Sequence, residues 1–142
     1  MNREIKFRGK CSPQSKYQGE WVTGSLVIPE IIEDNELLIV VAHSDNCKTT
    51  YHVDKDTVGQ FTGFKDEGGK EIYDGDIVKF LHVGECTRGI IAWNEKLGAW
   101  CIKLKGENSL GSAPVGEMLS LYTIEVIGNI HNNPELIKEE KK

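Results

Sequence analysis

Carboxylates crowd a short stretch near the middle of the chain, and those considered for chemistry are Asp66, Glu71, Asp74 and Asp76. Paired carboxylates bind divalent cations and serve as general acid and base, so a metal-dependent hydrolase is one hypothesis for this segment. The spacing does not match an EF-hand, which places oxygen ligands at alternate positions before a glycine and a terminal glutamate. Asp76 with Lys79 resembles the acidic-plus-lysine sets of metal-dependent nucleases. Residues three apart on a strand point to opposite faces, however, which argues against such a set.

The same residue types also build turns, and turn architecture is the favoured interpretation of this segment. Aspartate accepts hydrogen bonds from backbone amides, and glycine adopts positive φ without steric cost. The residues of the expected structural motif are Gly59, Gly63, Asp66, Gly69, Asp74, Gly75 and Asp76. The chain is therefore expected not to be an enzyme, and no catalytic, metal-binding or cofactor-binding residue is assigned.

Other chemical motifs are weak or missing in the sequence. It contains no Gly-x-Ser-x-Gly, no phosphate-binding loop and no His-Glu-x-x-His. His43, Cys47 and His52 lie close in sequence, but three such residues without a fourth ligand are more typical of ordinary loop and strand positions.

The cysteines predict free thiols. Cys11, Cys47, Cys86 and Cys101 form no Cys-x-x-Cys pair. The first residues carry no apolar run of a signal peptide, so the cytoplasm is the expected compartment, and its reducing conditions disfavour disulfides. No apolar run is long enough to span a bilayer, so no membrane partner is expected.

Charge argues against nucleic acid as the main partner. The 142 residues contain 17 Lys and Arg against 22 Asp and Glu, a formal net charge of −5, whereas nucleic-acid binding is driven by basic surfaces. One basic strip near the start of the chain remains as an alternative, and an alternating first strand places its Lys6, Arg8 and Lys10 on the outer face. The residues of this strip are Arg3, Lys6, Arg8 and Lys10.

Short alternating apolar segments separated by turn residues predict a mainly β protein. The predicted strands are residues 3–8, 20–28, 37–42, 50–53, 58–64, 77–81, 88–93, 99–104 and 122–130. The continuous aliphatic run 37–42 predicts a strand buried on both faces. Short helical turns are expected at 54–57, 119–121 and 133–135, and a long loop over 106–117.

The segments 88–93 and 99–104 predict a hairpin. A register with Trp93 opposite Ala99 places Ile90 and Trp100 on one face, and Ile91 and Cys101 on the other. Both faces are then apolar, so the second face must be covered. Cover from the same chain is favoured, and a second copy of the chain is the alternative.

The sequence resembles the YopX family of phage and prophage proteins. The most specific likeness lies in residues 58–66, VGQFTGFKD, and 69–78, GKEIYDGDIV. Further similar stretches are residues 3–10, REIKFRGK, 21–26, WVTGSL, 125–131, EVIGNIH, and 133–136, NPEL. Residues 29–53 and 82–121 do not match the family pattern.

The resemblance implies a phage-derived protein of the bacterial cytoplasm, of unassigned biochemical role and without catalytic residues to transfer. A β lobe of residues 1–55 is expected to pack on an SH3-like barrel of residues 56–131, followed by a short helical or frayed tail, 132–142. The expected function is an accessory role through binding and self-association, with a phage or host protein as further partner. Nucleic-acid binding and metal-dependent hydrolysis are the alternatives.

Overall fold

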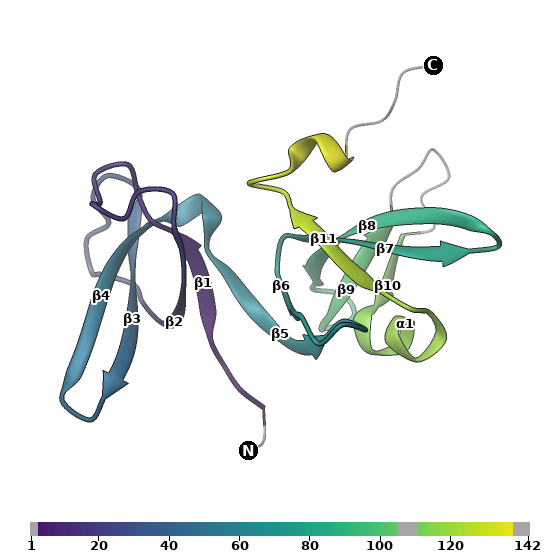
Figure 1. Cartoon of the computed structure of the whole chain (residues 1–142), viewed down its shortest axis with the longest axis horizontal. Helices are drawn as coiled ribbons and strands as arrows, with labels where there is room; N and C mark the ends of the chain where they lie inside the picture. The colour runs from purple at the N-terminus through teal and green to yellow at the C-terminus, as the bar shows by residue number, and fades with distance from the viewer. Residues whose placement is uncertain (1–2, 105–110, 138–142) are drawn as a thin grey trace. The chain divides into compact units, whose positions relative to one another are not determined.

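The computed structural model describes residues 3–104 and 111–137, and these form two antiparallel sheets with short helices (Figure 1). The mainly β class predicted from the sequence is confirmed. The chain divides into two compact units, Met1–Phe61 and Thr62–Lys142. No helix in the described part of the chain has the length and apolar character needed to cross a membrane.

The first unit contains β4, β3, β2, β1 and the start of β5, neighbours in that order in a six-stranded antiparallel sheet whose sixth strand is Glu71–Tyr73. Its elements are β1 (Phe7–Lys10), β2 (Trp21–Val27), β3 (Glu36–Ser44), β4 (Cys47–Asp54), the 3-10 helix η1 (Lys55–Thr57) and the start of β5 (Gly59–Lys65). Asp54 caps η1, because its side chain accepts a hydrogen bond from the Asp56 amide at 3.0 Å.

The core of the first unit forms on one face of its sheet. Leu37, Ile39 and Val53 are buried there, while Leu38 and Val40 on the opposite face are only half-buried. The prediction of a strand buried on both faces was therefore wrong for β3. Its aliphatic residues alternate in burial because only one face of the sheet is covered by a core.

The second unit contains a five-stranded sheet with the order β10-β9-β8-β7-β11. Its elements are β6 (Glu71–Tyr73), β7 (Asp76–His82), β8 (Glu85–Asn94), β9 (Ala99–Leu104), β10 (Ser112–Pro114), α1 (Val115–Leu121), β11 (Glu125–Asn129) and the 3-10 helix η2 (Pro134–Ile137). Its core contains Ile72, Val78, Phe80, Ile91, Trp100, Ile102, Val115, Met118, Ile124 and Val126.

The β8–β9 hairpin has a register one residue away from the predicted one. Trp93 pairs with Trp100 and Ile91 pairs with Ile102, so that Asn94, not Trp93, faces Ala99. The Asn94 side chain accepts a hydrogen bond from the Leu97 amide at 3.0 Å and so closes a shorter turn than predicted. A one-residue slip exchanges the faces of a strand, so the predicted assignment of Trp100 and Ile91 to opposite faces was wrong.

The predicted loop over 106–117 was also wrong where the structure describes it. Ser112–Pro114 form β10, which pairs with β9, and Val115 begins α1, which is longer than the predicted turn at 119–121. Residues 106–110 of that predicted loop, and 138–142 of the predicted tail, lie outside the described residues.

Candidate functional site

The structure places the motif aspartates against backbone amides. Asp66 is buried, and its two carboxylate oxygens accept hydrogen bonds from the Lys70 amide at 2.8 Å and the Val126 amide at 2.9 Å. The Glu67 amide also donates to the Ile124 carbonyl at 3.1 Å. The turn after β5 is thereby joined to the start of β11, a segment sixty residues away in sequence.

Asp76 closes the turn between Tyr73 and the start of β7, and the Gly75 backbone joins this turn to distant residues. Asp76 is 1% exposed, and its Oδ2 accepts a hydrogen bond from the Tyr73 amide at 2.7 Å. Gly75 has φ +87°. Its amide donates to the Ile91 carbonyl and its carbonyl accepts from the Ile130 amide, each at 2.9 Å. A residue with a side chain is disfavoured at this positive φ.

The remaining residues of the motif lie in the same turns and in the strands next to them. Gly63 and Gly69 also have positive φ, of +90° and +84°, and Gly59 lies buried on β5. Asp74 is half-buried between β6 and β7, and Glu71 accepts a hydrogen bond from the Tyr73 hydroxyl at 3.2 Å. No three His, Cys, Asp or Glu side chains of the described chain are grouped so that they could hold a metal ion.

The basic residues near the N-terminus contact aromatic rings of the first unit. The Arg8 guanidinium lies 5.0 Å from the centre of the Trp21 ring, and the Lys6 ammonium lies 5.0 Å from that of Phe61. Lys6 also pairs with Glu4 at 3.2 Å. The strand begins at Phe7 and ends at Lys10, so Arg3 and Lys6 precede it, contrary to the predicted strand 3–8.

The four cysteines are free thiols, as predicted. Cys47 and Cys86 are exposed, whereas Cys11 and Cys101 are buried. Burial raises the pKa of Cys101, and burial together with the nearby Glu20 carboxylate raises the pKa of Cys11. Cys86 lies opposite Leu81 in the β7–β8 ladder.

A polar cluster in the first unit was not anticipated. The Ser12 hydroxyl donates to Glu36 Oε2, and His52 Nδ1 lies 3.9 Å from Glu36 Oε1. Ser12 is almost fully buried, so a substrate has no access to its hydroxyl. His43, by contrast, hydrogen-bonds to Thr49 across the β3–β4 hairpin at 2.8 Å.

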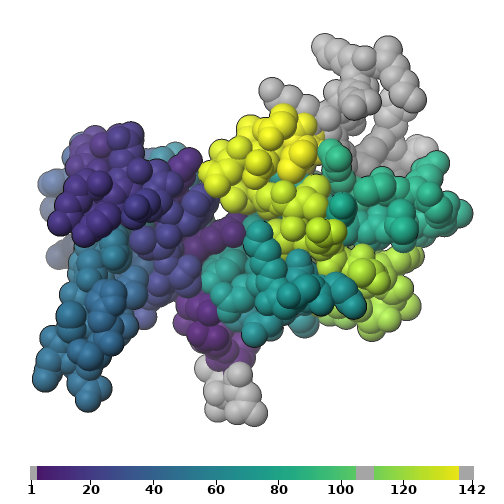
Figure 2. All heavy atoms as spheres, in the orientation of Figure 1, coloured from purple at the N-terminus to yellow at the C-terminus, as the bar shows by residue number. Residues whose placement is uncertain are grey.

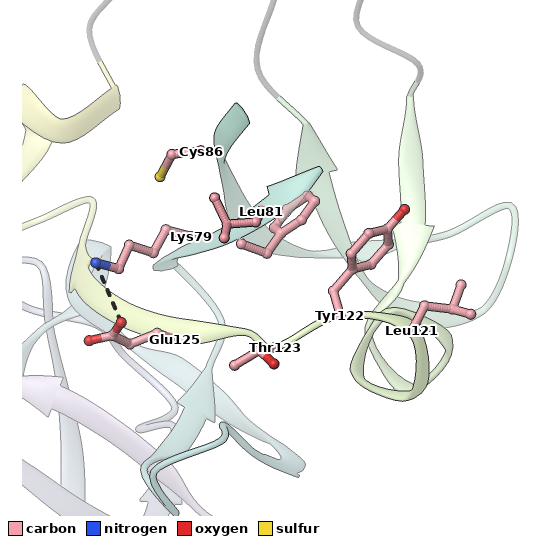
Figure 3. Close-up of a pocket in the computed structure, with 8 residues that line it drawn as sticks. Lys79, Leu81, Cys86, Leu121, Tyr122, Thr123 and Glu125 are labelled. Atoms are coloured by element: carbon pink, nitrogen blue, oxygen red, sulfur yellow. Dashed lines mark ion pairs between the residues drawn. The ribbon is translucent and has the colours of Figure 1, made fainter. Parts of the chain in front are cut away.

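The second unit carries a groove of about 510 Å³ between the β7–β8 hairpin and the segment that joins α1 to β11 (Figure 3). Its lining is Lys79, Phe80, Leu81, Cys86, Leu121, Tyr122, Thr123 and Glu125. Aromatic and aliphatic side chains form most of this surface. Lys79 and Glu125 lie at one side of it and pair at 3.4 Å (Figure 3).

Tyr122 is held in position by two contacts of its ring and hydroxyl. The ring packs against Phe80 with 5.2 Å between centroids, and the hydroxyl lies 2.9 Å from His82 Nδ1. The groove therefore has an ordered aromatic wall. Such a wall suits apolar side chains of a partner, since aromatic rings bury much area with few rotatable bonds.

The β7–β8 hairpin ends beside this groove in an exposed apolar tip. Val83 is 87% exposed, and Leu81 and Leu121 at the groove are 68% and 65% exposed. The tip stands out from the rest of the second unit in green in Figure 2. Val83 and Gly84 have φ of +51° and +77°, the signature of a two-residue type I′ turn.

The groove was not predicted from the sequence. Phe80 and Leu81 belong to a predicted strand, residues 82–87 belong to no predicted element, and 119–121 form a predicted helical turn, none of them with a chemical motif. The one signal is the dipeptide Val83-Gly84, because a valine stands where such a turn favours asparagine.

Comparison with known proteins agrees with the resemblance. Residues 6–138 match the family described as YopX protein. Protein EF1440 from Enterococcus faecalis has a similar structure, with TM-score 0.54 and 20% identity over 96% of this chain and 100% of its own. Protein yopX from Bacillus subtilis gives TM-score 0.53 and 20% identity over 98% and 99%. No curated protein matches the chain. The family match covers nearly the whole sequence, and the chain belongs to the YopX family.

Proposed function

We propose that this protein is a non-enzymatic accessory protein that acts by binding and self-association, through the groove and hairpin tip of its second unit. The observation that carries the proposal is the position of exposed Val83 beside an apolar groove on the same unit. The proposal includes the phage or prophage origin and the cytoplasmic location implied by the family resemblance.

A second copy of the chain is the occupant we infer for the groove. Twofold dimers use one self-complementary surface twice, so a protrusion must lie near the recess that receives it. Val83 and Leu81 supply the protrusion, and Phe80, Leu121 and Tyr122 line the recess. The three large aliphatic side chains exposed around this groove also form a cluster, whereas a typical monomer exposes such side chains singly.

The backbone at the tip supports an intermolecular role for Val83. A β-branched residue at φ +51° is disfavoured by about 1–3 kcal/mol, whereas asparagine adopts this conformation readily. Val83 is almost fully exposed, so contacts within the chain do not offset that cost. Contact with another molecule would offset it.

We further propose that the second unit is a small SH3-like barrel. The meander β7-β8-β9-β10, the short helix α1 and the return of β11 onto β7 support this interpretation. The Val126 amide of β11 donates to Asp66, and the Glu67 amide donates to the Ile124 carbonyl just before β11. These hydrogen bonds cover the edge of β11 that faces away from β7, which supports a closed sheet. This fold supplies a rigid frame for the groove but does not specify an activity.

The alternatives have less support. Both oxygens of Asp66 and one oxygen of Asp76 accept amide hydrogen bonds, which leaves the carboxylate cluster poorly suited to hydrolysis. Lys6 and Arg8 contact aromatic rings of their own unit, and the net charge is −5, which disfavours nucleic-acid binding through the N-terminal strip.

Size-exclusion chromatography with light scattering tests the proposal. We expect the wild type to have a mass above that of one chain at high micromolar concentration. Leu81→Glu with Leu121→Glu should return it to the monomer mass, because buried charge in an apolar contact is strongly unfavourable. Both residues are largely exposed, so the fold should survive.

Leu97→Glu is the matched control, because Leu97 is 56% exposed on the same unit but does not line the groove. It should leave the mass of the assembly unchanged. A monomeric wild type, or an assembly that persists in the groove variant, would contradict the proposal.

A further inference from the structure

The first unit carries an exposed segment that combines aliphatic and acidic residues. It consists of Val27, the last residue of β2, and the loop that follows, and is here called the acidic–apolar loop, residues 27–34. Four of its side chains belong to the exposed large hydrophobic residues of the described chain. They are Val27, Ile28, Ile31 and Ile32, with exposures of 42%, 65%, 74% and 41%. Isolated exposed aliphatic residues are common, but four within six positions are not.

The carboxylates of this loop have no partners among the described residues. Glu30, Glu33 and Asp34 are exposed, and their side chains form no ion pair or hydrogen bond with the part of the chain that the structure describes. The sequence from 17 to 47 contains no Lys or Arg. No basic side chain of the flanking sequence therefore offsets this negative charge.

The end of the loop is fixed to the rest of the unit. Asp34 and Asn35 have φ of +53° and +58°, and the Glu36 amide donates to the Glu33 carbonyl at 3.0 Å. The Asn35 amide group donates to the carboxylates of Asp54 and Asp56 at 3.1 and 3.0 Å. An anchored loop loses less conformational entropy on binding than a freely moving one.

We propose that the acidic–apolar loop binds a basic amphipathic segment of a partner protein. The aliphatic side chains would bury the apolar face of that segment, and the carboxylates would pair with its lysines or arginines. Charge complementarity selects this occupant, because an acidic segment or an anionic surface would be repelled. The site is independent of the groove of the second unit.

Fluorescence anisotropy with a defined probe tests this inference. The probe is a labelled synthetic helix of leucine and lysine with all leucines on one face, compared with the same peptide carrying glutamate for lysine. We expect the lysine peptide alone to bind. Ile31→Ser should weaken binding about tenfold through lost apolar contact, and Glu30→Gln with Glu33→Gln about fivefold.

Controls separate this site from general attraction to an acidic protein. Glu95→Gln with Glu117→Gln removes two exposed glutamate charges from the second unit, and Leu97→Ser removes an aliphatic side chain there that is more than half exposed. Both should bind the lysine peptide like the wild type. Equal losses in control and loop variants, equal binding of both peptides or no binding at all would overturn the inference. So would a wild-type dimer that Ile31→Ser dissociates, because the occupant would then be a second copy.

Discussion

At the scale of single residues, the buried aspartates of the family motif accept hydrogen bonds from backbone amides, Asp66 from a distant strand and Asp76 from the adjacent turn. Asp66 joins the turn after β5 to β11, and Asp76 closes the turn between β6 and β7. An ionised carboxylate is a strong acceptor for amides that would otherwise be buried without a partner. The motif is best understood as part of the scaffold of the second unit.

Replacing Asp66 with alanine should therefore destabilise the protein. Two amides, of Lys70 and Val126, would lose their acceptor. We expect the free energy of unfolding to fall by about 3 kcal/mol, measured by urea denaturation. The exposed neighbour Glu67→Ala should change it by less than about 0.5 kcal/mol. Equal effects of the two substitutions would contradict the role assigned to Asp66.

Gly24 of the first unit lies at a position where the neighbouring strand leaves no room for a side chain. A Cβ at Gly24 would lie 2.3 Å from the Val40 carbonyl oxygen of the neighbouring strand. Gly24→Ala should destabilise the protein by about 2 kcal/mol, because the backbone must shift to relieve the clash. Gly68→Ala is the control, since its Cβ would meet only Asp66 Oδ1 at 3.6 Å. Thermal unfolding of both variants decides between these outcomes.

The buried cysteines predict a loss of stability at alkaline pH. The pKa of Cys101 is raised by burial above its ordinary value of 9.0. Above that pH the thiol ionises in the unfolded chain while the folded chain keeps it protonated, so the unfolded state gains stability. The melting temperature should fall as pH rises beyond about 9, and less steeply in Cys101→Ala. An unchanged slope would show that this thiol does not contribute.

At the scale of elements, the β7–β8 hairpin combines strain with exposure. Val83→Asn should relieve the positive-φ strain and stabilise the second unit by about 1 kcal/mol. The same substitution should reduce self-association, because it removes the apolar tip. Chemical denaturation and light scattering on one preparation would measure both effects. A variant that is less stable, or equally associated, would contradict the function assigned to Val83.

Sequence reasoning located most strands because alternation and turn residues are local signals. It predicted the wrong register for the β8–β9 hairpin. There the Asn94 side chain accepts a hydrogen bond from the Leu97 amide, which shortens the turn and shifts the pairing by one residue. It also missed β10, whose three residues include Pro114 and depend on pairing with β9. The groove was not predictable either, because Leu81 and Tyr122 come together only through the sheet and α1.

At the scale of the whole molecule, the two units carry different exposed surfaces. The second unit presents a groove and a hairpin tip that are both apolar, and the first unit presents the acidic–apolar loop. These surfaces lie on opposite sides of the division between the units in sequence. The two proposals together assign self-association to the second unit and recruitment of a basic partner to the first.

Site-specific crosslinking tests the central claim most directly, because Cys86 already lines the groove. In a Cys47→Ser background, a Val83→Cys chain that also carries Cys86→Ser is mixed with a longer, tagged chain that keeps Val83 and Cys86, so that no two exposed thiols share one chain. Mild oxidation should give a mixed disulfide-linked dimer on a non-reducing gel, whereas Leu97→Cys in place of Val83→Cys should give none. No mixed dimer from Val83→Cys, or an equal amount from Leu97→Cys, would contradict the placement of the tip in the groove of a second copy.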